Sequence, residues 1–220
     1  MDNKLKVFIM DIASMRKEYK MKNLSEEAVI HDPMQQFKQW FEESIEAQVP
    51  EPNAMILATC SAEAKPSARV MLLKGVTPEG FIFYTNYESR KGLELAQNPQ
   101  ASVVFLWLEL ERQVRIEGVV KKVTREESEQ YFYSRPFESQ VSAIISPQSK
   151  AIEGKLELEA LHKKTTEMYL GAKVPFPDHW GGFLLSPTTI EFWQGRESRF
   201  HDRIQFTKKD ASWSWVRLAP

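Results

Sequence analysis

The stretch AMILATCSAEAKPSARVMLLKGVTPEGFIFYTN, residues 54–86, decides the fold class. It contains three short runs rich in Val, Ile, Leu, Phe and Tyr, and Gly, Pro, Ser and Asn residues typical of turns stand around them. Two further runs of the same kind follow at residues 101–110 and 112–123. Because strands joined by short turns pair in opposite directions, these five runs predict an antiparallel sheet.

A helix is predicted before the sheet, in HDPMQQFKQWFEESIEAQ, residues 31–48. Asp32 is placed to cap this helix and Pro33 to occupy its first position. Four apolar residues at helical spacing predict a face packed on a core, namely Phe37, Trp40, Phe41 and Ile45. We therefore expect one domain, in which a helical segment, residues 1–50, packs on a barrel formed by residues 51–220.

The second half of the chain predicts two helices followed by more strands. Thr124 and Glu127 form the capping box of a helix in TREESEQYFYSR, which Pro136 ends. A charged helix is predicted within residues 153–170. The last apolar runs predict strands at residues 181–186, 189–195, 200–208 and 212–219. The whole pattern is that of a mainly β protein, an antiparallel barrel or strongly bent sheet with flanking helices.

Composition restricts the class of partner. The chain has 220 residues, a formal net charge of -1 and a pI near 6.5, so it lacks the basic excess typical of nucleic-acid binding. Its one cysteine, Cys60, excludes an intrachain disulfide and any site built from several thiolates. The apolar runs are too short for a membrane span, and the N-terminus does not resemble a secretory signal. We expect a cytoplasmic protein with no membrane or nucleic-acid partner.

The sequence lacks the common catalytic and metal-binding motifs, so its candidate functional residues are Arg, Lys and His residues in several separate segments. The sequence has no Gly-rich phosphate loop, no nucleophile elbow and no paired-cysteine motif, so we predict no metal site. In TNYESRKGLELAQNP, residues 85–99, Ser89 is the expected N-cap of a helix from Arg90 to about Gln97. Arg90 and Lys91 would then lie at the positive end of the helix dipole. A bound phosphate would stabilise them there, and a solvated helix end is the alternative.

A second group of cations lies in RFHDR, residues 199–203. If this segment is a strand, Arg199, His201 and Arg203 share one face, which would suit an anion or a polar ring.

Two further segments carry cations next to strand or helix ends. Arg69 and Lys74 lie on opposite faces of one predicted strand, so they meet in one site only if that strand bends. Tyr131 and Arg135 are one helical turn apart, and Ser139 follows just beyond the proline. Phenol, guanidinium and hydroxyl together would hold a phosphate monoester, and a solvated helix end is again the alternative.

The segments that carry these residues resemble the pyridoxamine 5'-phosphate oxidase family. RVMLLKG, FYTNYESRKG, LERQVRIEG, YFYSRPFESQVSAIISPQS, HWGGF, IEFWQGRESRFHDR and the terminal RLAP stand in the order and spacing of that family. The resemblance extends from about Met15 to Pro220. It implies a homodimeric split β-barrel that binds FMN in two clefts at the subunit interface.

The resemblance also implies a reaction. Members of the family oxidise pyridoxamine 5'-phosphate or pyridoxine 5'-phosphate to pyridoxal 5'-phosphate, with hydride transfer to flavin N5. Molecular oxygen reoxidises the flavin and gives hydrogen peroxide, and the amine substrate also releases ammonia. The implied role is vitamin B6 biosynthesis or salvage. Two alternatives stay open here: another split-barrel flavoprotein oxidoreductase, or a non-catalytic carrier or sensor of FMN or pyridoxal 5'-phosphate.

Carried over position by position, the resemblance implies roles for single residues. The implied FMN contacts are Arg69, Val70, Met71, Leu72, Leu73, Lys74, Tyr84, Thr85, Arg90, Lys91, Gln113, Gln148, Ser149, Trp193 and Arg203. The implied substrate contacts are Arg16, Tyr19, Lys74, Tyr131, Arg135, Ser139, Arg199 and His201. Arg199 and His201 are also the implied catalytic residues. The family often has Asp where this chain has Glu51, so the role of Glu51 is open.

Overall fold

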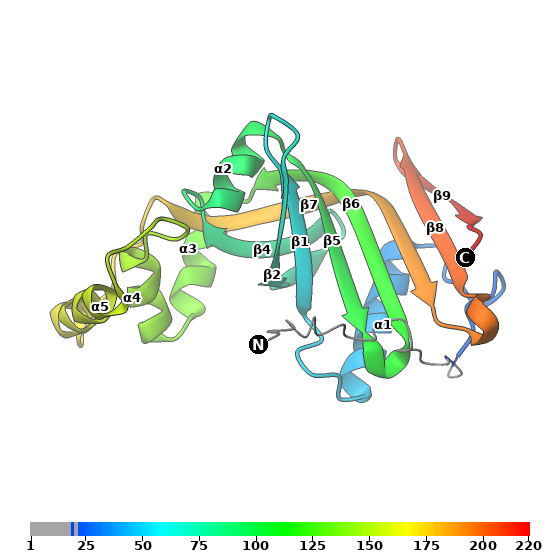
Figure 1. The fold of residues 1–220 in the computed structure, drawn as a ribbon, viewed down its shortest axis with the longest axis horizontal. Helices are drawn as coiled ribbons and strands as arrows, with labels where there is room; N and C mark the ends of the chain where they lie inside the picture. The colour runs from blue at the N-terminus through cyan, green and yellow to red at the C-terminus, as the bar shows by residue number, and fades with distance from the viewer. Residues whose placement is uncertain (1–18, 20–21) are drawn as a thin grey trace, which may run out of the picture.

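The computed structural model describes residue 19 and residues 22–220, and its main element is a nine-stranded antiparallel sheet curled into a half-barrel (Figure 1). The strands are β1 (Ala54–Cys60), β2 (Pro66–Leu72), β3 (Gly75–Thr77), β4 (Gly80–Asn86), β5 (Gln100–Trp107), β6 (Arg112–Lys122), β7 (Trp180–Gln194), β8 (Asp202–Lys209) and β9 (Ser212–Arg217). The helices are α1 (Pro33–Glu46), α2 (Arg90–Gln97), α3 (Arg125–Ser134), α4 (Phe137–Ile145) and α5 (Lys155–Tyr169), with short 3-10 turns η1 (Leu108–Leu110) and η2 (Glu197–Arg199). The predicted antiparallel, mainly β architecture is confirmed.

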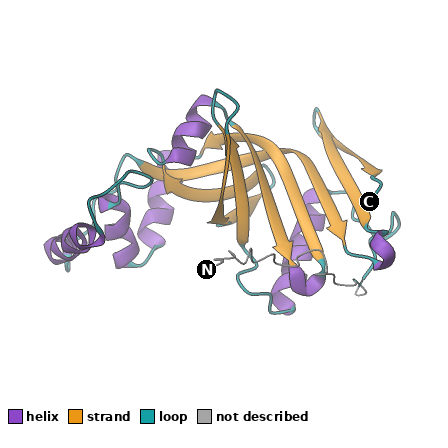
Figure 2. Cartoon of the chain, viewed as in Figure 1, coloured by secondary structure: helices purple, strands orange, loops and turns teal. Residues whose placement is uncertain are grey.

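The strands form one curved sheet (Figure 2), in which β7 pairs with three other strands. Strand β7 is 15 residues long and pairs with β6, while β4 pairs with its first half and β8 with its second half. The sequence predicted two strands here, and the structure has one. The β6–β7 register shifts between Glu117 and Gly118, where a Cβ on Gly118 would lie 2.1 Å from the backbone oxygen of Ser186. Glycine therefore permits the close approach of the two strands at this bulge.

One face of the sheet forms the hydrophobic core. Fully buried side chains follow one continuous row of paired positions across five strands: Leu57, Val103, Ile116, Ile190 and Phe206. Burial of such a row removes a large apolar area from water and is the main stabilising contribution to the fold.

Helix α1 covers this core. As predicted, Asp32 caps the helix and a proline occupies its first position. The ring of Phe37 lies 4.8 Å from that of Phe81, measured between centroids. Ile45 is 54% exposed, so its predicted place in the buried face is wrong. The buried stripe ends at Ser44, and the next residue of a helix is rotated by about 100° away from it. The domain division at residue 50 stays a prediction.

The opposite face of the sheet is open. Its apolar side chains on the strands nearest the β2 edge are between 36% and 68% exposed, namely Ile56, Val70, Leu72 and Leu106. We call these four residues the open apolar face. A contiguous exposed surface of this kind commonly marks an interface with another protein.

Helices α3, α4 and α5 form a second packed unit at one end of the sheet (Figure 1). Its buried residues include Phe132, Val141, Val174 and Trp180. The capping box predicted at the start of α3 is confirmed. The sequence analysis did not predict α4, which begins immediately after the proline that ends α3. Within the described residues, no helix combines the length and apolar character needed to cross a membrane.

Of residues 199–203, only Asp202 and Arg203 belong to a strand, so the strand predicted at residues 200–208 is present but begins two residues later. Ser198 and Arg199 have φ values of 53° and 63°, and β8 begins only at Asp202. The left-handed backbone interrupts the two-residue period before the strand begins. Arg199 is exposed and does not share a strand face with Arg203.

Candidate active site

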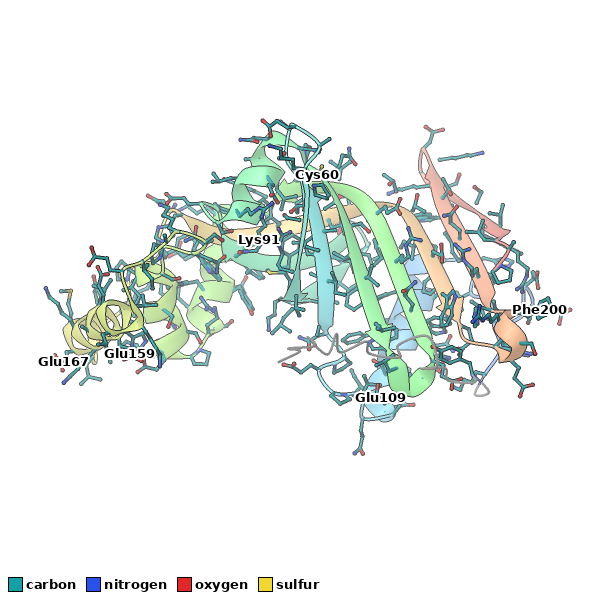
Figure 3. All side chains as sticks on the ribbon, viewed as in Figure 1. Cys60, Lys91, Glu109, Glu159, Glu167 and Phe200 are labelled. Atoms are coloured by element: carbon teal, nitrogen blue, oxygen red, sulfur yellow. The ribbon has the colours of Figure 1, made fainter. Side chains whose placement is uncertain are left out.

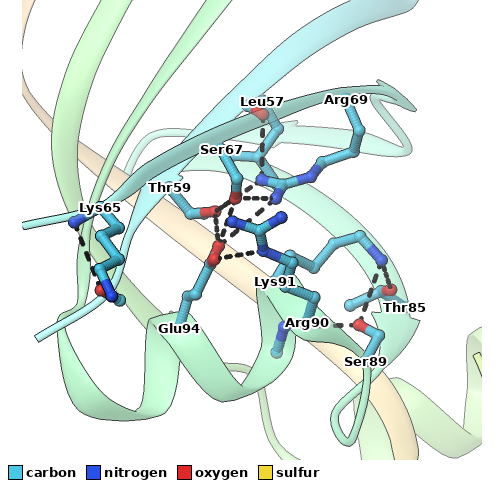
Figure 4. Close-up of polar contacts among 12 residues, drawn as sticks. Leu57, Thr59, Lys65, Ser67, Arg69, Thr85, Ser89, Arg90, Lys91 and Glu94 are labelled. Atoms are coloured by element: carbon cyan, nitrogen blue, oxygen red, sulfur yellow. Dashed lines mark hydrogen bonds and ion pairs between the residues drawn. The ribbon is translucent and has the colours of Figure 1, made fainter. Parts of the chain in front are cut away.

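Three cations from two elements meet at the N-terminus of α2 (Figure 4). Arg69 on β2 and Arg90 on α2 both contact Glu94, with Nη2–Oε2 at 3.4 Å and Nε–Oε1 at 2.8 Å. The buried Nζ of Lys91 donates hydrogen bonds to Gln148 Oε1 at 2.7 Å, Thr85 Oγ1 at 3.0 Å and Ser89 Oγ at 3.1 Å. We call Arg69, Arg90 and Lys91 the cationic cluster. As predicted, Ser89 caps α2, and its side chain accepts from the backbone of Gly92.

The cationic cluster is electrostatically suited to an anion. Burial and the charge of Arg69 lower the pKa of Lys91 to about 8. The three oxygens that accept from the Lys91 ammonium belong to neutral side chains, so they satisfy its hydrogen bonds without balancing its charge. Backbone N–H groups of the first turn of α2 add to the positive potential. The donor set fits a phosphate monoester.

A second group of predicted residues lies on the open side of the sheet. Leu106, Gln113, Trp193 and Arg203 are successive paired positions across β5, β6, β7 and β8. The Arg203 guanidinium is held by Glu191, with contacts of 3.0 and 3.2 Å. We call Gln113, Trp193 and Arg203 the tryptophan row.

Tyr19 and His201 pack on the tryptophan row. Their ring centroids lie 5.7 and 4.7 Å from that of Trp193. Gly195 permits this packing, because a Cβ there would lie 2.7 Å from Cγ of Tyr19. Two cavities adjoin Tyr19. One of about 570 Å³ is lined by Tyr19, Lys22, Asn23, Arg196, Glu197, Phe200 and Asp202, and one of about 350 Å³ by Tyr19, Leu106, Leu108, Glu111, Arg112, Gln113 and Trp193.

His201 has a defined protonation state. Its Nδ1 accepts a hydrogen bond of 3.1 Å from the backbone N–H of Arg196, so the proton of the neutral ring is on Nε2. Burial and the positive charge of Arg199 lower the pKa of His201, against a smaller opposite effect of Asp202. The ring is therefore a neutral donor at Nε2 near pH 7.

Arg135 lies against one ring of a stacked aromatic group, Tyr84, Tyr131 and Trp180, which we call the aromatic box. The rings of Tyr84 and Tyr131 stack at 3.8 Å, and Tyr131 is nearly parallel to Trp180 at 6.2 Å. The Arg135 guanidinium lies 4.6 Å from the centre of the Trp180 ring. Its Nη1 is buried and has no hydrogen-bond partner in the described part of the chain. Buried donors are almost always paired, so this atom indicates a site for an acceptor.

The other predicted residues lie around these groups. Ser139 is half-buried in the first turn of α4. Lys74 is exposed just after β2, and its backbone N–H donates to Ile82 on β4 at 2.8 Å. The remaining predicted cofactor residues lie in two segments. On and just after β2, Val70 and Leu72 belong to the open apolar face, Met71 is half-buried and Leu73 is buried. In the loop after α4, Ser149 is exposed and has a φ of 71°. Arg16 lies outside the described residues. Glu51 is exposed in the turn before β1.

Within one chain, the predicted cofactor and substrate residues lie in three separate regions. Arg69 is paired with Leu57 of the core row, whereas the tryptophan row belongs to the opposite face. Helices α3 and α4, which carry the Arg135 site, lie at one end of the molecule's longest axis, and β8 lies at the other (Figure 1). Figure 3 shows Phe200 at the β8 end and Lys91 on α2, nearer the middle of the molecule. Within the described part of one chain, Arg135 and His201 are therefore not brought together.

Comparison with known proteins decides the family. Residues 41–169 match the family described as "Pyridoxamine 5'-phosphate oxidase", and residues 180–220 match the "Pyridoxine 5'-phosphate oxidase C-terminal dimerisation region". The chain belongs to the pyridoxamine 5'-phosphate oxidase family. The resemblance seen in the sequence is confirmed, and the chain is an oxidase of this family.

Relatives of the pyridoxamine 5'-phosphate oxidase family cover almost the whole chain. A protein of Paraburkholderia phymatum named pyridoxine/pyridoxamine 5'-phosphate oxidase is 53% identical over 210 residues, covering 95% of this chain and 99% of the relative. A protein of the same name from Leptospira interrogans is 52% identical, covering 95% and 98%.

Solved structures related to the pyridoxamine 5'-phosphate oxidase family share the fold. PhzG from Burkholderia lata, in complex with tetrahydrophenazine-1-carboxylic acid, matches with a TM-score of 0.86 at 27% identity, covering 91% of this chain and 99% of that one. An FMN-binding pyridoxamine 5'-phosphate oxidase-related protein from Nostoc punctiforme matches with a TM-score of 0.65 at 15% identity, covering 84% and 97%. The predicted split-barrel class is thus confirmed.

Several site residues of this pyridoxamine 5'-phosphate oxidase family member escaped the sequence analysis. They are Thr59, Ser67, Glu94, Trp180, Glu191 and Gly195, each of which contacts a predicted residue. Glu94 is four residues after Arg90, a spacing that predicts an ion pair on a helix. Ser67 lies two residues before Arg69 on the same face of β2, a spacing that a predicted strand also gives. The other four contacts join segments distant in sequence or lie across a strand pair, and only the fold shows them.

Proposed function

We propose that this chain is an FMN-dependent oxidase that converts pyridoxamine 5'-phosphate and pyridoxine 5'-phosphate to pyridoxal 5'-phosphate. The observation that carries the proposal is the buried, unpaired Nη1 of Arg135 beside the aromatic box. A guanidinium donor in such a place gains a charge-assisted hydrogen bond when a phosphate arrives. The names of relatives that are more than half identical support the choice of substrate.

The cationic cluster is the proposed site for the FMN phosphate. One carboxylate, Glu94, pairs with Arg69 and Arg90, while Lys91 is bonded to neutral oxygens. The cluster therefore keeps two positive charges for a phosphate monoester of about −1.5 to −2 charge. Thr85, Gln148 and Ser149 would complete its surroundings, and the tryptophan row would contact the ring system. When bound, FMN supplies the two-electron acceptor, and its reoxidation by oxygen yields hydrogen peroxide.

The proposed active site takes residues from two copies of the chain. Residues 180–220 match a dimerisation region, and the open apolar face offers a surface for a second copy to cover. Because the cationic cluster and the tryptophan row lie on opposite faces of one sheet, one FMN would reach both groups only across such an interface. A homodimer of this kind would bring Arg135 of one copy toward His201 of the other, although the two residues lie at opposite ends of one chain.

In this composite site, Arg135, His201 and Arg199 would each contact a different part of the substrate. Arg135, with Lys74, Tyr131 and Ser139, would hold the phosphate and fix the position of the pyridine ring. The Nε2–H of His201 would donate to an oxygen on that ring. Arg199 would stabilise negative charge that develops on the substrate. This assignment makes His201 a donor rather than a base, because its Nδ1 already accepts from the backbone.

The test is an anaerobic and aerobic assay of the purified protein. We expect a bound oxidised flavin spectrum that bleaches when pyridoxine 5'-phosphate is added without oxygen. In air, the same addition should produce pyridoxal 5'-phosphate and hydrogen peroxide. A flavin spectrum that stays oxidised under both conditions would mean a carrier or sensor, or a flavoprotein for another substrate.

The affinity for FMN should fall as the pH rises from 7 to 9. Lys91 has its pKa lowered to about 8 in the free protein, so its charge is present below this pH and is lost above it. The FMN phosphate would raise this pKa in the complex, so the dissociation constant should increase by about tenfold at pH 9. The phosphate remains a dianion throughout this range, because its second pKa is about 6.

Titration of the free protein with FMN at several pH values measures this effect. The variant Lys91→Met should bind FMN more weakly at pH 7 and show a flat profile between pH 7 and 9. A wild-type profile that is also flat would show that the Lys91 ammonium does not contact the phosphate.

A further inference from the structure

We propose that Glu94 is a positioning residue for the flavin phosphate: its carboxylate holds the guanidinium groups of Arg69 and Arg90 in the arrangement that a phosphate needs. The inference rests on the proposed FMN site and adds to it a residue of opposite charge. A carboxylate beside a phosphate would by itself weaken binding through repulsion. The geometry of Glu94 indicates why it is nevertheless favourable here.

Glu94 is saturated with donors from three elements (Figure 4). Its Oε2 accepts from Thr59 Oγ1 on β1 at 2.5 Å, from Ser67 Oγ on β2 at 2.6 Å and from Arg69 Nη2 at 3.4 Å. Its Oε1 accepts from Arg90 Nε at 2.8 Å. The side chain is only 8% exposed. The carboxylate therefore ties α2 to the β1–β2 hairpin at the point where the two guanidinium groups meet.

The carboxylate is ionised at every pH at which the enzyme would work. Burial alone would raise the pKa of Glu94, but hydrogen bonds from Ser67, Thr59 and Arg90 outweigh it and lower the pKa to about 2. Its negative charge is thus a permanent part of the site. Four donors share that charge, which reduces the repulsion that a phosphate on the far side of the guanidinium groups would feel.

The two guanidinium groups are fixed in different ways. Arg69 is held by β-sheet partners as well, because its Nη1 donates to Thr59 Oγ1 at 2.6 Å and to the backbone oxygen of Leu57 at 3.2 Å. The Arg90 side chain is 62% exposed, and its ion pair with Glu94 uses Nε. This pairing leaves the two terminal nitrogens of Arg90 for a ligand. Without Glu94, two like charges would repel and the exposed Arg90 side chain would regain its rotamer freedom.

Whether Glu94 strengthens or weakens FMN binding depends on how far it orders the cationic cluster before FMN binds. The positively charged groups of the cationic cluster must lie close together before FMN binds, and in a free protein that arrangement is opposed by their mutual repulsion. Glu94 offsets the repulsion in the free state and still leaves two uncompensated positive charges. We expect the loss of this ordering to outweigh the Coulomb gain from removing one negative charge.

The experiment compares FMN with riboflavin, which has the same ring system and no phosphate. Flavin-free wild-type protein and the variant Glu94→Gln are titrated with each ligand. We expect Glu94→Gln to raise the dissociation constant for FMN by about tenfold and that for riboflavin by less than about twofold. The matched control is Glu88→Gln, since Glu88 lies just before α2 but makes a surface pair with Lys150. This control should change neither value.

Three outcomes would separate the hypotheses. If Glu94→Gln weakens both ligands equally, or binds FMN as tightly as the wild type does, the positioning role is wrong. If the wild-type protein itself shows no preference for FMN over riboflavin, the proposed phosphate site is wrong and the inference fails with it. If Glu94→Gln does not fold, Ser67→Ala tests the same arrangement, because the Ser67 hydroxyl donates to Glu94 and accepts from Arg69. Ser67→Ala should weaken FMN by about threefold without affecting riboflavin.

Discussion

Mixing two inactive variants, Arg135→Ala and Arg199→Ala, should restore about one quarter of the wild-type oxidase activity if subunits exchange freely. The expectation follows from the proposed site, in which the phosphate-binding residues of one copy face Arg199 and His201 of the other. Each homodimer of a single variant lacks one essential arginine in both sites. A mixed dimer has one site that lacks both arginines and one site that is complete.

The measurement is the initial rate of pyridoxal 5'-phosphate formation after the variants are mixed, dissociated and reassembled. The control mixes Arg135→Ala with Arg135→Gln, which share the same defect and should remain inactive together. Recovery in the first mixture alone supports the composite site. If the first mixture stays as inactive as its components although exchange is demonstrated with differently tagged subunits, each site is built from one chain.

The composite site illustrates what a sequence predicts well and what it does not. The residues at the start of α2 were predicted correctly, because Ser89 and the two cations after it form a local pattern. The same holds for the capping box of α3 and for the N-cap and first proline of α1. Each of these signals depends on residues within one helical turn, so the surrounding fold does not alter it.

Predictions that depended on the course of the backbone were less successful. The segment before β8 contains alternating charges, yet the left-handed residues Ser198 and Arg199 end the alternation. No glycine or proline marks that change in the sequence. The joining of two predicted strands into β7 likewise follows from pairing with β6, a contact between segments far apart in the chain.

The candidate site was predictable as a set of residue types but not as an arrangement. The faces occupied by Arg69 and Trp193 follow from strand register, which no local pattern specifies. The same limit applies to Glu94, whose four hydrogen-bond donors come from three elements. The buried atom Nη1 of Arg135 could be recognised as unpaired only after every neighbouring side chain had been placed.

The variant Arg135→Met should lower kcat/KM for pyridoxine 5'-phosphate by about 100-fold, because it removes charge-assisted hydrogen bonds to the substrate phosphate. The same variant should not destabilise the free protein. Methionine keeps a contact with the Trp180 ring, and it removes the buried guanidinium nitrogen that has no partner among the described residues. The value of kcat/KM should therefore fall while the Tm of the free protein stays constant or rises.

This opposition distinguishes a binding role of Arg135 from a structural one. Arg125→Met is the matched control, since the Arg125 guanidinium also lies over an aromatic ring, that of Phe176, but pairs with Asp178 on the surface. The control should retain its kcat/KM. A fall in the Tm of Arg135→Met that parallels the loss of activity would assign Arg135 to the packing of α3 against Trp180. If the Tm is unchanged, kcat/KM should fall for pyridoxine 5'-phosphate and not for unphosphorylated pyridoxine. This result would assign the buried nitrogen of Arg135 to the phosphate, because only that group supplies the missing acceptor.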